Sequence, residues 1–200
     1  MTKTRDESKR MFELLKEEIS EVAKRLRKDP KSQCWRRIFV RSVFSMIESE
    51  CYRLKENTLS LIRKNSFERN KFSPGDISLL EEKAYSLDNK GRIEEKSIHL
   101  KTESNLRFAF SSAAKFSLDF KLDVSDTGWE SFKKAIKIRH RVTHPKKISD
   151  LSISDEEKDS VKKAFLWFID SFKSLKISQS KYHAKKAGNL KELIKEIDGW

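Results

Sequence analysis

The chain has 200 residues, of which 36% are hydrophobic and 38% are charged, and its formal net charge is +13. Its 13 Phe and 4 Trp residues argue against a disordered chain, because aromatic side chains bury a large area per residue. With only 5 Gly and 3 Pro for turns, helices are favoured over a sheet protein. The positive charge attracts polyanions such as nucleic acids, although lysine-rich helices can equally serve only to keep a protein soluble.

Two long helices are predicted in the first third of the chain. Apolar residues at helical spacing predict a helix over residues 6–28, which Pro30 ends. A longer helix is predicted over residues 32–67. Its apolar residues cover more than one face, which is typical of a helix at the centre of a bundle.

The middle of the chain predicts shorter helices. Asp76 is the predicted N-cap of a helix over residues 77–86, and Gly91 is predicted to take a positive φ angle in the C-cap and loop that follow. A short helix is predicted over residues 93–100. Another is predicted over residues 104–120, where an alternation of Phe and Ala leaves a strand as the alternative.

Two further helices have clear beginnings. Ser125 or Asp126 is predicted to cap a helix over residues 127–143, which stops before Pro145. Ser154 begins a capping box, and the helix behind it carries the cleanest amphipathic stripe of the sequence.

These elements predict a single all-α helical bundle, residues 1–177, followed by a basic helical tail, residues 178–200. Cys34 and Cys51 fall on one predicted helix roughly 25 Å apart, too far for a disulfide. No apolar stretch has the length of a membrane span or the pattern of a signal peptide. We therefore expect a cytoplasmic protein with no membrane partner.

The segment over residues 129–145 predicts a catalytic site. Helical spacing predicts one stripe formed by Trp129, Phe132, Ile136, Arg139 and Thr143. An arginine in an apolar stripe needs an anion or an acceptor. His140 and His144 lie on the flank of the stripe, and Pro145 places His144 at the end of the helix. A guanidinium that binds phosphate and an imidazole that exchanges protons near neutral pH suit acid–base chemistry on a phosphate ester.

The run Arg139-His140-Arg141-Val142-Thr143-His144-Pro145 resembles the signature of the HEPN superfamily (higher eukaryotes and prokaryotes nucleotide-binding). That signature is an Arg, a polar residue, further residues and then a His that is often followed by Pro. The resemblance extends more loosely over the long second helix, the region 80–100 and the helix from Ser154. Asn or Asp is commoner after the family's Arg, where this chain has His140.

The resemblance implies an HEPN-like helical bundle that is an endoribonuclease and needs no metal and no cofactor. It further implies a homodimer with two copies of the motif facing across a cleft, and a toxin or antiviral defence role with an antitoxin or defence-system partner. Carried onto this chain, His144 would activate the ribose 2′-hydroxyl or protonate the leaving oxygen. Arg139 would hold the scissile phosphate, and His140 would orient the substrate. RNA is the implied substrate, because DNA lacks the attacking 2′-hydroxyl.

Glu48, on the long second helix, is a supporting candidate, because a carboxylate there can orient an Arg or a His. A solvated or capping role for Glu48 stays open. The alternative for the whole motif is structural: Arg139 pairs with Glu48 and His144 only ends its helix. The chain would then be a non-catalytic helical module that binds RNA, a nucleotide or a partner protein. No metal site is expected, because Arg141 stands where a zinc-protease motif has Glu.

Overall fold

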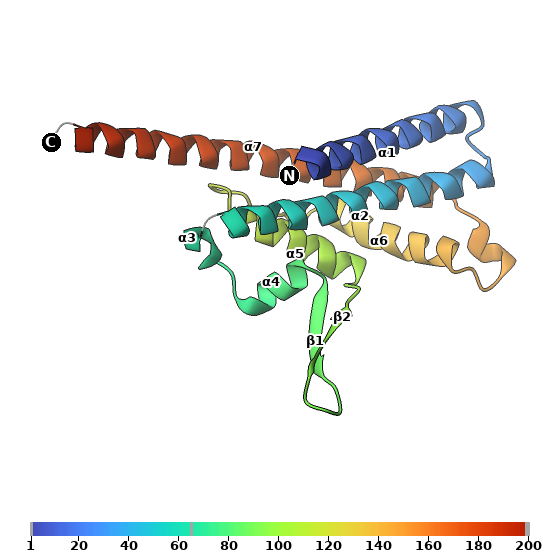
Figure 1. The fold of residues 1–200 in the computed structure, drawn as a ribbon. Coiled ribbons are helices and arrows are strands. Elements are labelled where there is room, and N and C mark those ends of the chain that lie inside the picture. The colour runs from blue at the N-terminus through green and yellow to red at the C-terminus, as the bar shows by residue number, and fades with distance from the viewer. Residues whose placement is uncertain (1, 65, 199–200) are drawn as a thin grey trace. The chain divides into compact units, whose positions relative to one another are not determined.

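The structure is a computed structural model that describes residues 2–64 and 66–198. Most of these residues are helical, and the protein is all-α apart from a two-stranded sheet in the described part of the chain (Figure 1). The chain forms two compact units. Unit 1 comprises residues 1–54, 100–106 and 123–169, and unit 2 comprises residues 55–99, 107–122 and 170–200.

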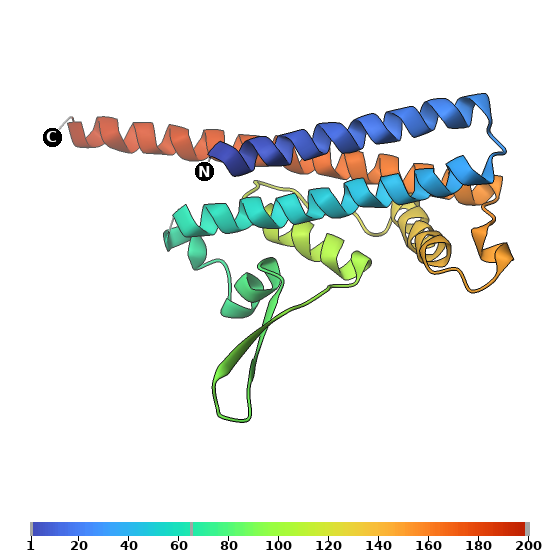
Figure 2. The same cartoon turned by 45° about the vertical axis from the view of Figure 1, so that its right-hand side comes forward.

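Unit 1 is built from helices that lie mostly where the sequence predicts them. They are α1 (Thr2–Lys28), the first part of α2 (Gln33–Lys64), the beginning of α5 (Thr102–Ala114), α6 (Thr127–Thr143), the 3₁₀ helix η1 (Ile148–Leu151) and the first part of α7 (Asp155–Asp198). The chain turns back between α1 and α2, so that these helices run antiparallel (Figure 2). The predicted N-cap Asp126 is confirmed, since its side chain accepts from the Trp129 backbone N–H at 2.7 Å.

Aromatic rings from three helices meet in the core of unit 1. The Phe132 ring of α6 lies 5.4 Å from Trp129, 5.5 Å from Trp167 and 6.2 Å from Phe44, measured between ring centroids. Phe44 and Phe132 are almost completely buried. Burial of such large rings supplies much of the favourable free energy of folding, and their shapes fix how α2, α6 and α7 meet.

A buried arginine joins the ends of the unit 1 helices. The Arg36 guanidinium donates to the Pro30 carbonyl, to the Ile153 carbonyl at 2.6 Å and to the Asp155 carboxylate at 2.6 Å. The predicted capping box at the start of α7 is confirmed beside it. Ser154 Oγ accepts from the Glu157 backbone N–H, and the Glu157 carboxylate accepts from the Ser154 backbone N–H.

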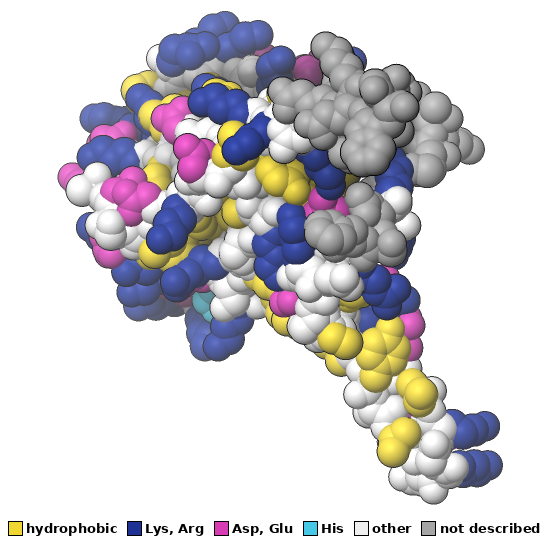
Figure 3. Space-filling model, turned by 90° about the vertical axis from the view of Figure 1, so that its left-hand side faces the viewer, with side chains coloured by type: hydrophobic (Ala, Val, Ile, Leu, Met, Phe, Trp, Pro, Cys, Tyr) yellow, Lys and Arg dark blue, Asp and Glu magenta, His cyan; other side chains and the backbone are white. Residues whose placement is uncertain are grey.

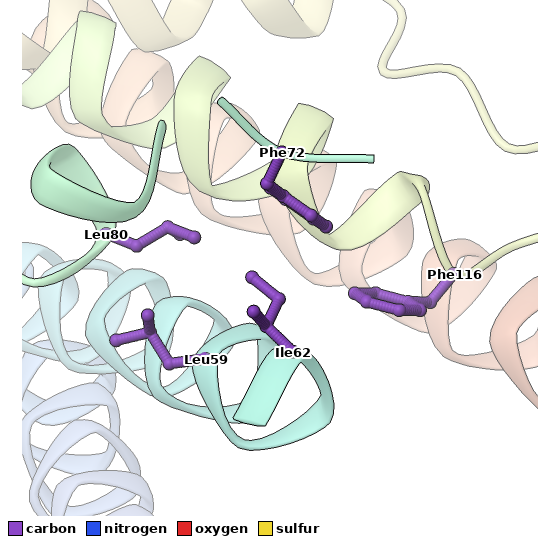
Figure 4. Close-up of a cluster of buried hydrophobic side chains, with 5 residues drawn as sticks. All are labelled: Leu59, Ile62, Phe72, Leu80 and Phe116. Carbon is purple, nitrogen blue, oxygen red and sulfur yellow. The ribbon is translucent and has the colours of Figure 1, made fainter. Parts of the chain in front are cut away.

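Unit 2 contains the short helices α3 (Ser66–Arg69) and α4 (Pro74–Leu80), the strands β1 (Lys83–Leu87) and β2 (Ile93–Ser97), and the remaining parts of α2, α5 and α7. Its core is a cluster of buried apolar side chains contributed by α2, α4 and the loops that end α3 and α5 (Figure 4). The cluster consists of Leu59, Ile62, Phe72, Leu80 and Phe116. The Phe72 and Phe116 rings stack with their centroids 5.8 Å apart.

The middle of the chain corrects several sequence predictions. The helix predicted over residues 77–86 ends at Leu80, and the residues after it form β1. The helix predicted over residues 93–100 is instead β2, which pairs antiparallel with β1. Gly91 has the predicted positive φ of 75°, but it serves the turn of a hairpin rather than a helix C-cap. The Glu- and Lys-rich sequence of β2 favours a helix locally, and pairing with β1 overrides that preference.

Two further boundaries differ from the predictions. The N-cap of α4 is Ser73 rather than Asp76, because Pro74 occupies the first helical position and Asp76 completes a capping box from the third. The helix predicted over residues 104–120 is α5, which forms over Thr102–Ala114 without the alternative strand.

Helix α7 passes through residue 178 without a break, and the predicted division into 1–177 and 178–200 stays a prediction. Among the described helices, none has the length and hydropathy that a membrane crossing requires.

A buried carboxylate anchors the end of α3 in unit 2. Glu68 is 4% exposed, and its carboxylate accepts from Tyr182 at 3.2 Å, ion-pairs with Lys71 at 2.8 Å and ion-pairs with Lys186. Burial by itself raises the pKa of Glu68, but the hydrogen bonds and charges of Lys186 and Lys71 outweigh it and lower the pKa to about 2. The ionised carboxylate is therefore the form that this part of the fold requires.

We expect acid to destabilise the protein through Glu68. Because its pKa in the folded state lies below the ordinary 4.5, its stabilising effect is present above about pH 4.5 and is lost as pH falls toward 2. The loss is at most roughly 3 kcal/mol of the free energy of unfolding. Urea unfolding at pH 6, 4 and 3 should show a shallower pH dependence for Glu68→Gln than for the wild type. Glu94→Gln, at an exposed position on β2, should keep the wild-type slope.

Gly128 predicts a second stability effect. A Cβ atom at this position would lie 2.7 Å from Trp167 Cβ and closer still to two atoms of its indole ring, so Gly128→Ala must displace Trp167 from the aromatic core. We expect a loss of about 1–3 kcal/mol in the free energy of unfolding, measured by urea titration. The matched control is Gly188→Ala, where nothing lies within 4 Å of the added atom and a helical alanine stabilises slightly. Equal stabilities of the two variants would contradict the packing argument.

Candidate active site

The rotation of α6 about its axis decides which residues of the motif reach solvent. Its buried residues are Trp129, Phe132, Ala135, Ile138 and Val142. The predicted stripe through Ile136, Arg139 and Thr143 is therefore wrong beyond Phe132, because Ala135 and Ile138 take the core-facing positions and Thr143 is exposed. Arg139 consequently lies at the boundary between the core and the surface.

Arg139 is held by the predicted supporting residue. Its Nη2 atom donates to Glu48 Oε1 at 3.0 Å, and the side chains are 31% and 41% exposed, respectively. An ion pair with this degree of exposure contributes only about 0–1 kcal/mol to stability. Water reaches both groups, so an incoming anion can compete with Glu48 for the guanidinium.

His140 and His144 come together on the exposed side of α6. Their ring centroids are 5.2 Å apart, and both residues are exposed. His144 is the C-cap of the helix, with its backbone N–H donating to the His140 carbonyl at 3.0 Å. Neither imidazole makes a hydrogen bond to any other residue that the structure describes, so both rings are open to a ligand.

The structure brings the four candidates together as two pairs. Arg139 and His144 are five residues apart, which places them about 140° apart around the helix axis and roughly 7.5 Å apart along it. Arg139 points toward α2 and Glu48, whereas the two imidazoles face solvent. All four residues belong to unit 1: Arg139, His140 and His144 lie at the end of α6, and Glu48 reaches Arg139 from α2.

Arginines that the sequence did not single out hold the end of α6 in place. Arg41 on α2 donates to the Val142 carbonyl at 3.0 Å, which satisfies an acceptor at the helix end. Arg141 makes a salt bridge at 2.8 Å with Glu157 of α7 and donates to the Ser152 carbonyl. Glu157 was identifiable from the sequence as a capping-box residue, but its second role required the fold.

Basic residues continue along the exposed side of α6. Lys133, Lys137, His140 and His144 follow one another at steps of four, three and four residues, and we call this set the basic row. Lys133 is paired with Glu130 at 2.7 Å, whereas Lys137 has no ion-pair partner among the described residues. The spacing of the row was visible in the sequence, but its exposure depends on how α6 is turned.

The site has no evident metal-ligand set. In the described part of the chain, no three His, Cys, Asp or Glu residues are grouped as ligands of a metal ion would be. Beside the two imidazoles stand Arg139 and Arg141, and their positive charge disfavours a bound cation.

Comparison of the chain with protein-family models, with curated proteins and with solved structures finds no match.

Proposed function

We propose that the protein is a metal-independent endoribonuclease of the HEPN type, which cleaves RNA with Arg139 and His144. The observation that carries the proposal is the pair of solvent-facing imidazoles at the end of α6. The same helix end carries Arg139, whose ion-pair partner among the described residues is the half-exposed Glu48. Both side chain types that phosphate-ester cleavage needs are thus available to a ligand.

The proposed reaction uses the ribose 2′-hydroxyl as the nucleophile. The 2′-oxygen bonds to the adjacent phosphorus while the bond from phosphorus to the 5′-oxygen breaks, leaving a 2′,3′-cyclic phosphate and a 5′-hydroxyl. One proton leaves the 2′-hydroxyl and one reaches the departing oxygen; His144 performs one of these transfers. Arg139 leaves Glu48 to bind the phosphate and stabilise its developing charge, and His140 positions the nucleotide.

We further propose that the enzyme works as a homodimer in a toxin or antiviral defence system. The two pairs of candidates diverge within one chain, and a second copy of the motif would supply a complementary set to the same phosphate. A cytoplasmic location fits a substrate that is cellular or viral RNA. The competing proposal, a non-catalytic module that binds RNA, a nucleotide or a partner protein, is favoured by the Arg139–Glu48 ion pair, which is the contact a structural arginine would make.

Cleavage of single-stranded RNA in EDTA tests the proposal. We expect the wild type to produce cyclic-phosphate ends, and Arg139→Ala or His144→Ala to reduce the rate at least a hundredfold, on the order of an acid–base or charge-stabilising contribution. Glu48→Gln should have a smaller effect, because it removes only the group that holds Arg139.

The controls separate chemistry from folding. Thermal unfolding of both alanine variants should stay within about 1 kcal/mol of the wild type, since the replaced side chains are exposed or half exposed. His99→Ala, at an exposed histidine of unit 2, should cleave normally. RNA binding without cleavage by the wild type and both variants would support the non-catalytic module instead.

The basic row gives a separate prediction about binding. If RNA lies along this side of α6, replacing Lys133 and Lys137 by Gln should weaken RNA binding and lower the salt dependence, the slope of log K against log salt concentration, by about 1.4 for two lost phosphate contacts. Fluorescence anisotropy with a labelled RNA, measured with His144→Ala to prevent cleavage, gives this slope. The matched control replaces Lys162 and Lys163, two exposed residues of α7 in the same unit. An unchanged slope in the Lys133/Lys137 variant would place the RNA elsewhere.

A further inference from the structure

Strand pairing and hydrogen bonds in the turn hold the hairpin of unit 2. Its strands pair in register from Lys83 opposite Ser97 to Leu87 opposite Ile93. In the turn, the Asp88 carboxylate accepts from the backbone N–H groups of Lys90 and Arg92 and from the Arg92 side chain, each at 2.8 Å. The bonds from the Arg92 backbone and side chain are the main reason why the pKa of Asp88 is lowered. The turn therefore holds both strands in place.

One face of this hairpin is apolar and uncovered. Residues that pair across an antiparallel ladder share a face, so Tyr85, Leu87 and Ile93 lie on one side. They are 54%, 70% and 75% exposed, and hydrophobic side chains are visible along the hairpin in Figure 3. The opposite face carries only small or charged residues: Ala84, Ser86, Glu94 and Lys96. An isolated two-stranded hairpin is at best marginally stable in water, so covering this apolar face would add to the stability of the hairpin.

The charge of this face distinguishes among its possible partners. Besides the apolar residues it carries Ser97 and one ion pair, in which Lys83 Nζ lies 2.9 Å from Glu95 Oε2. The face is thus neutral on a chain whose net charge is +13. A polyanion or an acidic protein would be drawn to the basic surfaces instead. A second copy of the chain is repelled by those surfaces, and a neutral apolar face is where it can approach.

We propose that this face binds the same face of a second copy of the chain, about a twofold axis that runs along the strands. In that arrangement β1 of one copy lies over β2 of the other. Leu87 then meets Ile93 of the second copy, and the Tyr85 hydroxyl is positioned to donate to Glu95 of the second copy. Each contact occurs twice, as a twofold interface requires. The proposal concerns a contact made by unit 2 alone, and it depends neither on RNA cleavage nor on the motif-to-motif dimer of the proposed function.

The contact is small, because a five-residue strand is only about 17 Å long. By itself it gives a weak dimer whose population rises with concentration. Sedimentation velocity of the full chain without RNA, from low to several hundred micromolar, tests this. We expect a reversible monomer–dimer equilibrium for the wild type. Leu87→Thr with Ile93→Thr places β-branched residues at both positions, so the strands are still favoured, but it removes four apolar side chains from each dimer. It should raise the dissociation constant about a hundredfold or more.

Matched variants make the outcome decisive. Ser86→Thr with Glu94→Thr changes the neighbouring cross-strand pair on the opposite face and should leave the dimer unchanged. Glu95→Lys makes the face positive, so its dimer should be weaker than that of the wild type and should strengthen with added salt. Circular dichroism should show the same helix content throughout, since every substituted position is exposed and lies on the hairpin. A wild type that stays monomeric, or a Leu87/Ile93 variant that dimerises normally, overturns the proposal and leaves the face to another partner. A wild type that dimerises but does not cleave RNA would instead count against the proposed function.

Discussion

The packing of Trp129 and Phe132 against Trp167 and Phe44 is the constraint on which the candidate site depends. These rings fix the rotation of α6 about its axis. Because successive side chains lie about 100° apart around a helix, that rotation also sets the direction of every later side chain of α6. Seven and eight residues beyond Phe132, Arg139 is placed at the edge of the core and His140 in solvent. A core whose role is stability therefore also sets the geometry of the motif.

Charge divides the arginines and lysines of the chain into two kinds. Arg36 is buried and fully used by carbonyls and a carboxylate, and Arg141 is committed to Glu157. Arg139 has a partner that water also reaches, and Lys137 has none among the described residues. The buried or firmly paired side chains hold helices together. The exposed ones can exchange their present partner, or water, for a ligand at a small cost in free energy. The basic side chains of the candidate site belong to this exposed group.

Much of the helical architecture could be predicted from local signals. The bounds of α6 follow from Asp126 before it and Pro145 after it, and the start of α7 follows from its capping box, because these devices act within one helical turn. The hairpin could not be predicted in this way. The sequence of β2 is rich in Glu and Lys, which favour helices, and only the hydrogen bonds to β1 make it a strand.

For the candidate site, the sequence by itself determined the residue types and their order: an arginine, two histidines four residues apart, and the proline that ends the helix beside them. It also indicated Glu48, as a carboxylate that can orient an Arg or a His, and offered its pairing with Arg139 as one alternative. Tertiary structure decided that Glu48 meets Arg139, that the imidazoles face solvent, and that Arg41 and Glu157 secure the helix end. The reason is physical. Capping and chain termination are local, whereas the rotation of a helix is set by side chains on other helices, which lie far away in the sequence.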